Sequence, residues 1–277
     1  MKKGQSIIGV FLFLIIGIIL VVGLLTVLFQ TNSSNDKEKT EMKKESIHIV
    51  AIGDSLTEGV GDTTNSGGYV PLVANLLEET DNYKKITTSN YGKSGDRSDQ
   101  ILARFNENKA MQEDVEGADI VVLTVGGNDI IQTFKQNFLT IAEDSFIAPR
   151  ETYEENLRML FTAIKEVNPE SELYIFGIYN PYSAYFPEIT EMQTILKEWN
   201  NQTQEVVNET ENATFVSIAD LFDQTLIQEE KEEPLIDGTD QKKSEVKNPY
   251  LYEEDLFHPN EAGYELMAEI LFQAIIK

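Results

Sequence analysis

Five short strand-like runs, most of them apolar, alternate with longer stretches whose apolar residues recur at helical spacing. The strand-like runs are Ile47–Gly53, Ile86–Tyr91, Asp119–Val125, Glu172–Ile178 and Ala213–Ile218. The helical patterns are Tyr69–Glu79, Ser98–Asn108, Thr152–Val167, Glu188–Thr210 and Glu261–Ile276. Apolar strands that alternate with helices are typical of a parallel sheet covered on both faces. The pattern therefore predicts an α/β fold with a five-stranded parallel sheet.

Two stretches fit this alternation poorly. Residues 130–150 carry Phe134, Phe138 and Ile141 at helical spacing, whereas residues 223–254 are largely polar and rich in Lys and Glu. The simplest interpretation is a packed helix for the first and a solvated surface loop for the second. Because both lie next to the motifs described below, a lid or a pocket wall is the alternative for either stretch.

A continuous apolar segment from Ile7 to Phe29 precedes the first strand and contains no charged residue. At about 1.5 Å per residue, a helix of this length spans roughly 35 Å, enough to cross a bilayer. The segment is longer than the apolar core of a cleaved signal peptide, and no Ala-x-Ala pattern follows it. We expect residues 1–29 to form a transmembrane signal anchor, residues 30–46 a charged linker, and residues 47–277 a single domain.

The charges around the apolar segment bear on its orientation. Lys2 and Lys3 precede it, and four lysines mixed with acidic residues follow it closely. A short tail before a first span usually stays in the cytoplasm, so we expect a single-pass protein of the cell membrane with its domain outside the cell. The segment lacks a pair of small residues four apart that would favour helix dimerisation, and we expect the domain to be monomeric.

Composition excludes several classes of function. The chain has 22 Lys and Arg against 47 Asp and Glu, a net charge of −25, and such a surface repels nucleic acid. It has no cysteine, which excludes disulfides, Cys-ligated zinc and a lipoprotein anchor. Its two histidines are His48 and His258, so chemistry assisted by an imidazole must use one of them. His48 opens the first strand with no acid at useful spacing, which is typical of a structural, partly exposed residue.

Polar motifs follow four of the predicted strands. The motifs are Gly53-Asp54-Ser55, Ser94-Gly95-Asp96, Gly126-Gly127-Asn128-Asp129 and Asp255-Leu256-Phe257-His258-Pro259. Taken singly, they have ordinary explanations as helix caps, a tight turn and a surface histidine. In a parallel sheet, however, ligands gather at the carboxyl ends of the strands. We therefore expect the four motifs to converge on one edge.

Together these residues meet the requirements of acyl transfer, which needs a nucleophile, a base, an acid that orients the base, and donors for the oxyanion. Ser55 supplies the hydroxyl, His258 is the base that accepts its proton, and Asp255 fixes the tautomer of the ring. The backbone N–H groups of Ser55 and Gly95 and the side-chain amide of Asn128 are the expected oxyanion donors. We expect no metal or organic cofactor.

With these motifs in this order, the chain resembles the SGNH hydrolases, also called the GDSL lipase/esterase family, over the whole domain. The family takes its name from catalytic Ser, Gly, Asn and His, matched here by Ser55, Gly95, Asn128 and His258. The resemblance implies a three-layer α/β/α sandwich with a flavodoxin-like sheet, and hydrolysis of esters or thioesters through an acyl-enzyme. Within the family, the chain looks most like membrane-anchored lipase/acylhydrolase-type proteins of Gram-positive bacteria.

The motifs do not choose a substrate, because members of this family act on lysophospholipids, short acyl esters, acetylated sugars and thioesters. Our first interpretation is a serine esterase or lipase-like acylhydrolase that cleaves lysophospholipids or other acyl esters at the cell surface. The second is a deacetylase or acyltransferase that acts on cell-wall glycans. The third is an inactive module that binds a glycan or lipid, and loss of a motif residue would have favoured it.

An aromatic loop follows the fourth predicted strand. It contains Tyr179, Tyr182, Tyr185 and Phe186. Such a loop could contact an acyl chain, but packing is the more common role of aromatic residues, and we do not assign these four to the site.

Overall fold

The computed structural model describes residues 46–80, 82–136, 142–181, 183, 190–224, 227–234 and 240–277. Its central sheet has five parallel strands in the order β2-β1-β3-β4-β5. The strands are β1 (Ile47–Gly53), β2 (Ile86–Gly92), β3 (Ile120–Thr124), β4 (Glu172–Phe176) and β5 (Ala213–Val216). This order is that of flavodoxin-like folds, and it confirms the predicted parallel α/β sheet.

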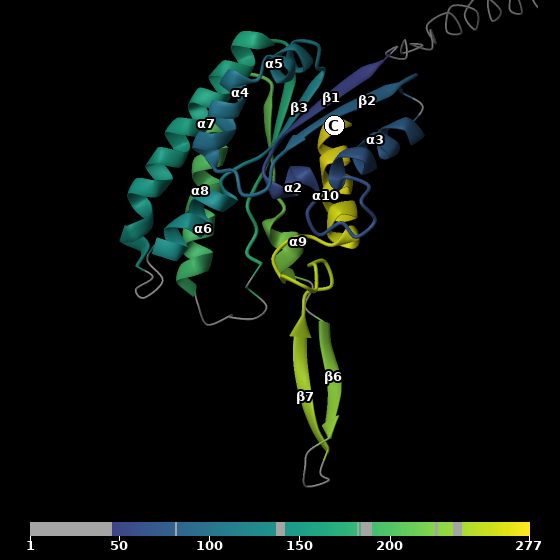
Figure 1. Ribbon diagram of the computed structural model, residues 1–277, viewed down its shortest axis with the longest axis vertical. Helices are drawn as coiled ribbons and strands as arrows, with labels where there is room; N and C mark the ends of the chain where they lie inside the picture. The colour runs from purple at the N-terminus through teal and green to yellow at the C-terminus, as the bar shows by residue number, and fades with distance from the viewer. Residues whose placement is uncertain are drawn as a thin grey trace, which may run out of the picture. The chain divides into compact units, whose positions relative to one another are not determined.

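Helices cover both faces of this sheet (Figure 1). One face carries α4 (Ser98–Glu107), α5 (Lys109–Glu116), α6 (Gly127–Gln136), α7 (Ile147–Val167) and α8 (Thr190–Asn208). The other face carries α3 (Tyr69–Glu79), α9 (Ala219–Gln224) and α10 (Glu261–Ile275). Two short elements, α2 (Ser55–Glu58) and the 3₁₀ helix η1 (Glu143–Phe146), connect longer ones. The structure therefore has the three layers that the sequence analysis expects.

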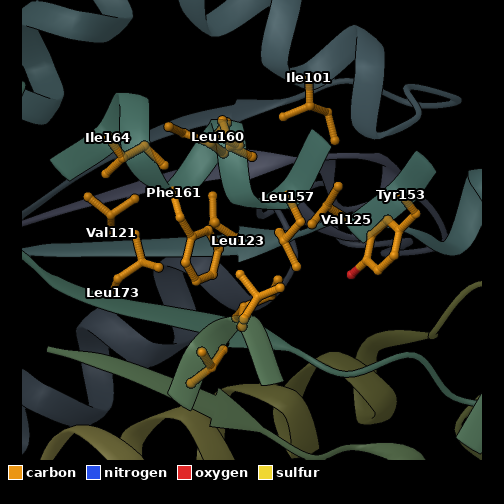
Figure 2. Close-up of a cluster of buried hydrophobic side chains, with 14 of the residues drawn as sticks. Ile101, Val121, Leu123, Val125, Tyr153, Leu157, Leu160, Phe161, Ile164 and Leu173 are labelled. Carbon is orange, nitrogen blue, oxygen red and sulfur yellow. The ribbon is translucent and has the colours of Figure 1, made fainter. Parts of the chain in front are cut away.

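Each strand contributes side chains to two separate cores, because successive residues of a strand point to opposite faces. Val50 and Ile52 of β1 belong to the core under α4–α8, whereas Ile49 and Ala51 belong to the core under α3 and α10. Figure 2 shows the first of these cores, where side chains of α7 pack on those of β3 and β4. Burial on both faces explains why β1 and β3 read as nearly continuous apolar runs, whereas the edge strand β2 is more polar.

The predicted membrane anchor at residues 1–29 and the linker at residues 30–46 lie outside the described residues, apart from Ser46. In the part of the chain that the structure does describe, no helix combines the length and apolar character needed to cross a bilayer. The proposed domain boundaries therefore remain predictions.

Residues 130–150 form three elements rather than one helix: most of α6, then η1, then the first turn of α7. α7 begins at Ile147, five residues before the predicted start. Pro149 is compatible with this start because it lies in the first turn, where the missing N–H costs no intrahelical hydrogen bond. The sequence analysis also missed α5, which is short and polar and buries only Met111 and Val115.

The prediction of a solvated loop for residues 223–254 is wrong for residues 227–234 and 240–247. The structure has an antiparallel hairpin there, formed by β6 (Ile227–Pro234) and β7 (Asp240–Lys247), which pair with each other apart from the main sheet. Its strands pair outside the main sheet, and their sequence lacks the apolar alternation that identifies a strand. At the base of the hairpin, the Asn248 side chain donates to the Phe222 carbonyl at 2.6 Å.

Candidate active site

Ser55 is the first residue of α2 and lies directly after β1, where it is 5% exposed. Asp54 caps this short helix, and its carboxylate accepts from the Leu56 amide at 3.0 Å and from the Thr124 hydroxyl at 2.9 Å. Gly53 is required at this point, because a Cβ there would lie 2.2 Å from Thr124 Oγ1. The serine therefore sits on a turn that the end of β3 holds in place.

Burial raises the pKa of Asp54 to about 6, although the hydrogen bonds from Leu56 and Thr124 oppose this shift. The Thr124 hydroxyl also lies 2.8 Å from the Thr57 hydroxyl, which in turn lies 3.0 Å from the Tyr69 hydroxyl. These buried polar groups therefore form hydrogen bonds with one another. They connect the serine turn to β3 and to the start of α3.

Gly95 follows β2 and has a φ of +84°, a conformation that favours glycine. Nothing lies within 4 Å of the position that a Cβ would take there, so this backbone has an open side. Asn128 lies in the first turn of α6, and its side-chain amide donates to the Asp96 carbonyl at 3.0 Å. The second and third motifs of the sequence are therefore in direct contact.

Asp129, the neighbour of Asn128, anchors the start of α6 to two other helices. Its carboxylate accepts from the Ser98 amide at 2.9 Å and from the Ser98 hydroxyl at 2.6 Å. Asn156 of α7 donates to that hydroxyl at 3.0 Å. Burial raises the pKa of Asp129 despite these hydrogen bonds. The fourth residue of the Gly-Gly-Asn-Asp motif thus fixes the orientation of the helix that carries Asn128.

Arg104 of α4 connects the first two motifs. Its guanidinium donates to the Asp96 carboxylate at 2.9 Å, to the Tyr91 carbonyl at 2.8 Å and to the Gly53 carbonyl at 3.0 Å. The arginine is mostly buried, and the Asp96 side chain is only 6% exposed. The sequence analysis missed this residue, although a basic residue next to Phe105 on the apolar face of α4 was a possible signal.

Asp255 and His258 form a compact turn before α10. His258 Nδ1 lies 2.6 Å from Asp255 Oδ2, while Asp255 Oδ1 accepts from the amides of Phe257 at 2.9 Å and His258 at 3.0 Å. Burial favours the neutral form of Asp255, but the hydrogen bonds from His258 and Phe257 outweigh it and hold its pKa below the usual value. An ionised carboxylate can only accept, so Nδ1 carries the proton and Nε2 of the neutral ring is an acceptor.

The histidine turn packs against the loop that follows the serine. The amide of Val60 donates to the Ser55 carbonyl at 3.0 Å, and the Tyr264 hydroxyl of α10 donates to the Val60 carbonyl at 2.7 Å. Gly61 has a φ of +92°, and a Cβ there would lie 3.2 Å from the Cβ of His258. A side chain at position 61 would therefore push the two turns apart.

A pocket with mostly apolar walls opens beside Ser55. Asn128 and Phe257 contribute to its wall, so the first, third and fourth motifs all reach it. Tyr179 supports Phe257 by donating from its hydroxyl to the Phe257 carbonyl at 2.6 Å. The remaining lining residues are Asp54, Leu56, Thr124, Val125, Gly127, Ile130, Ile131, Phe134, Phe176, Gly177, Ile178, Pro181, Met192 and Leu196.

The structure thus brings the residues of the four motifs to one edge of the sheet. His48 lies elsewhere, with its ring 2.9 Å from the Thr87 hydroxyl. The sequence analysis missed the apolar walls of the pocket and did not assign Tyr179, which belongs to it. Part of residues 130–150 forms one wall, which is the alternative considered for that stretch. Tyr182, Tyr185 and Phe186 of the aromatic loop lie outside the described residues.

Solved structures with a similar fold are known. A lipase from a goat rumen metagenome has a TM-score of 0.67 and 24% sequence identity, with 82% of this chain and 97% of that chain covered. An acetyl xylan esterase from Geobacillus stearothermophilus has a TM-score of 0.55 and 21% sequence identity, with 84% of this chain and 97% of that chain covered. At these identities, the likeness shows the α/β fold.

Sequence comparisons identify the family to which the chain belongs. The uncharacterized protein YpmR of Bacillus subtilis is 34% identical over 247 residues, which cover 88% of each chain. The spore germination lipase LipC of Bacillus licheniformis is 26% identical over 226 residues, which cover 81% of this chain and 94% of that one. The sequence profile of the GDSL-like Lipase/Acylhydrolase family matches residues 51–266, a range that contains all four motifs. The chain therefore belongs to the GDSL-like lipase/acylhydrolase family and is a hydrolase of ester bonds.

Proposed function

We propose that this protein is a serine esterase that cleaves acyl esters through an acyl-enzyme on Ser55. One observation carries the proposal. The hydrogen-bonded pair of Asp255 and His258 packs on the loop that follows Ser55, and Asn128 lines the same pocket as the serine. These contacts support Ser55 as the nucleophile, His258 as the base, Asp255 as the orienting acid and Asn128 as an amide donor.

The proposed reaction begins when Nε2 of His258 takes the proton of the Ser55 hydroxyl, and Oγ attacks the carbonyl carbon of the ester. The amides of Ser55 and Gly95 donate to the oxyanion. An asparagine amide has two N–H groups, and since one of Asn128 bonds Asp96, the other is left for the oxyanion. The imidazolium then protonates the leaving alcohol, and a water activated by the same histidine releases the acid.

A second candidate is removal of acetyl groups from cell-wall glycans, as hydrolysis or as transfer to another hydroxyl. The fold likeness to an acetyl xylan esterase favours it, since the same residues would carry out both reactions. Both candidates include attachment to the outer face of the cell membrane through residues 7–29. The apolar composition of that segment supports the attachment, and fractionation of cells that express the chain with and without residues 1–29 tests it.

Labelling with a fluorophosphonate tests the mechanism. The full chain in detergent is treated with the probe and digested, and mass spectrometry identifies the labelled residue. We expect label on Ser55, and we expect Ser55→Ala and His258→Ala to lose both the label and ester hydrolysis while keeping the melting temperature. A folded Ser55→Ala protein that still hydrolyses esters would falsify the mechanism. A folded, unaltered chain without label or hydrolysis would favour a binding module.

A further inference from the structure

The pocket beside Ser55 has walls of hydrocarbon from three separate elements. Ile131 and Phe134 come from α6, Ile178 follows β4, and Met192 comes from α8. All four side chains are half-buried, and each keeps part of its apolar surface accessible. Since apolar surface in contact with water is unfavourable, such walls favour an apolar occupant.

Ile131 distinguishes this pocket from an ordinary gap between core residues. Phe134, Ile178 and Met192 also pack on the core under α4–α8. Within the described residues, Ile131 packs in neither of the two core clusters, although it is half-buried and lines the pocket. The contribution of its side chain is therefore to the pocket wall rather than to the packing of the domain.

The polar atoms deeper in the pocket are already bonded to the protein. The Thr124 hydroxyl bonds the Asp54 carboxylate, and the Tyr179 hydroxyl bonds the Phe257 carbonyl. A sugar in this pocket would have to exchange its bonds to water for contacts with these walls. A hydrocarbon chain gives up no such bonds.

The position of the pocket relative to His258 decides which half of an ester it receives. The imidazolium must reach the leaving oxygen, so the alcohol lies on the side of His258. His258 precedes α10, on one face of the sheet, and neither it nor Asp255 lines the pocket. Most of the apolar walls, including those from α6 and α8, lie on the other face (Figure 1), whereas Phe176, Tyr179 and Phe257 line the pocket from the side of the histidine turn. The pocket is therefore on the acyl side of the bond that breaks.

We propose that this pocket binds the acyl chain, so that the preferred substrates are esters of acids substantially longer than acetate. This inference rests on the proposed serine esterase function and selects lipid-like acyl esters over acetylated glycans. Burial of one methylene corresponds to about a fourfold change in an equilibrium or rate constant. The specificity constant should therefore rise with chain length until the pocket is full.

The chain-length profile of the unaltered protein is the first test. The full chain in detergent is assayed with p-nitrophenyl acetate, butyrate, hexanoate and octanoate, which share one leaving group. We expect kcat/KM to rise about fourfold for each methylene in the first steps, and thus about 15-fold from acetate to butyrate. Each ester is kept below the concentration at which it forms micelles.

Two variants of Ile131 assign the preference to the pocket. Ile131→Trp should fill the pocket and lower the ratio of kcat/KM for octanoate over acetate at least tenfold. Ile131→Ala should enlarge the pocket and shift the optimum to longer chains. The matched control is Met159→Trp on α7, where the native side chain is 45% exposed, and it should leave the ratio unchanged. Melting temperatures show whether each variant is folded.

The outcomes separate this inference from the proposed function. Hydrolysis that is fastest for acetate, or a ratio that both folded Ile131 variants leave unchanged, overturns the acyl pocket while the esterase remains. If Ile131→Trp does not fold, the profile of the unaltered chain and of Ile131→Ala decides. A chain that hydrolyses no ester of any length and takes no label on Ser55 overturns the esterase itself.

Discussion

The two halves of the proposed active site are held in different ways. The half around Ser55 depends on contacts between residues far apart in the sequence, such as Asp54 with Thr124, 70 residues away, and Arg104 with Gly53, 51 residues away. The half around His258 depends mainly on hydrogen bonds to Asp255, three residues away, with one long-range bond from Tyr179 to the Phe257 carbonyl. The carboxylate side chain of Asp255 is 36% exposed, whereas Asp54 is 4% exposed.

This difference implies that the two halves respond differently to substitution. The serine half is held by buried side chains that bond distant residues, so loss of a supporting side chain such as Arg104 should lower stability as well as activity. The histidine half is local and near the surface, so changes there should lower activity with little effect on folding. The following substitutions test this contrast, from the largest expected effect to the smallest.

Asp255→Asn should lower kcat about 10³- to 10⁴-fold, because an amide at this position no longer holds the imidazole in the tautomer whose Nε2 is unprotonated and can accept a proton. The melting temperature should change by only a few degrees, since the side chain is partly exposed and its partners are local. Ester hydrolysis and thermal unfolding are measured on the same sample. A kcat within tenfold of the unaltered chain would contradict the role of Asp255.

Arg104→Met should lower the free energy of unfolding by about 3 kcal/mol, because it leaves the buried Asp96 carboxylate with only the longer, 3.7 Å ion pair to the exposed Lys93. The matched control is Arg150→Met, which breaks an ion pair with Glu198, whose side chain is 48% exposed, and should cost less than about 1 kcal/mol. Urea unfolding of both variants gives the comparison. Equal losses would show that Arg104 does not hold the serine half together.

Asp54→Asn should change how stability depends on pH. The pKa of Asp54 is about 6 in the folded protein and 3.8 at its ordinary value, so between these values the folded state binds more protons. The contribution of Asp54 to the free energy of unfolding therefore falls as the pH rises from about 4 to 6, by about 3 kcal/mol in all.

The asparagine variant lacks this decline, so its stability relative to the unaltered chain should rise over the same interval. Urea unfolding at pH 4 and pH 7 measures the two differences. The lowered pKa of Asp255 acts in the opposite direction, since its contribution is lost as the pH falls, but it is common to both proteins and cancels. Parallel pH curves for the two proteins would refute the burial effect at Asp54.

Tyr179→Phe should have the smallest effect, a loss of about 1 kcal/mol, because it removes one hydrogen bond and keeps the stacking of this ring on Phe222. Because that bond positions the histidine turn, kcat should fall a few-fold. Tyr174→Phe is the control, since it also loses one hydroxyl bond, to Glu172 in β4. If Tyr174→Phe lowers kcat as much, the support of Phe257 by Tyr179 has no functional importance.

Much of the fold could be predicted from the sequence, because both faces of the sheet are buried. A strand covered on both sides must be apolar throughout, and β1 was predicted with its observed boundaries. The hairpin of β6 and β7 and the helix α5 were not predicted. The hairpin of β6 and β7 pairs outside the main sheet, and α5 buries two side chains, so neither carries a long apolar pattern.

The candidate residues of the site could also be named from the sequence, because each belongs to a short motif of polar residues at the end of a strand. The supporting residues could not. Arg104 and Tyr179 act through bonds to backbone carbonyls, and any residue has a carbonyl, so no motif marks the partner. The pocket likewise combines side chains of α6 and α8, and its apolar residues look like core residues in the sequence.

The sequence by itself determined the layers of this protein and the chemical groups at its edge, since strand and helix periodicity and the Asp255-x-x-His258 spacing are local properties. Only the tertiary structure decided which groups meet, that Arg104 bonds the ends of two strands, and that Ile131 faces a pocket rather than a core. The physical reason is that these contacts depend on how helices pack across the sheet. Apolar residues recur at the same spacing in the sequence whether their side chains fill a core or line a pocket.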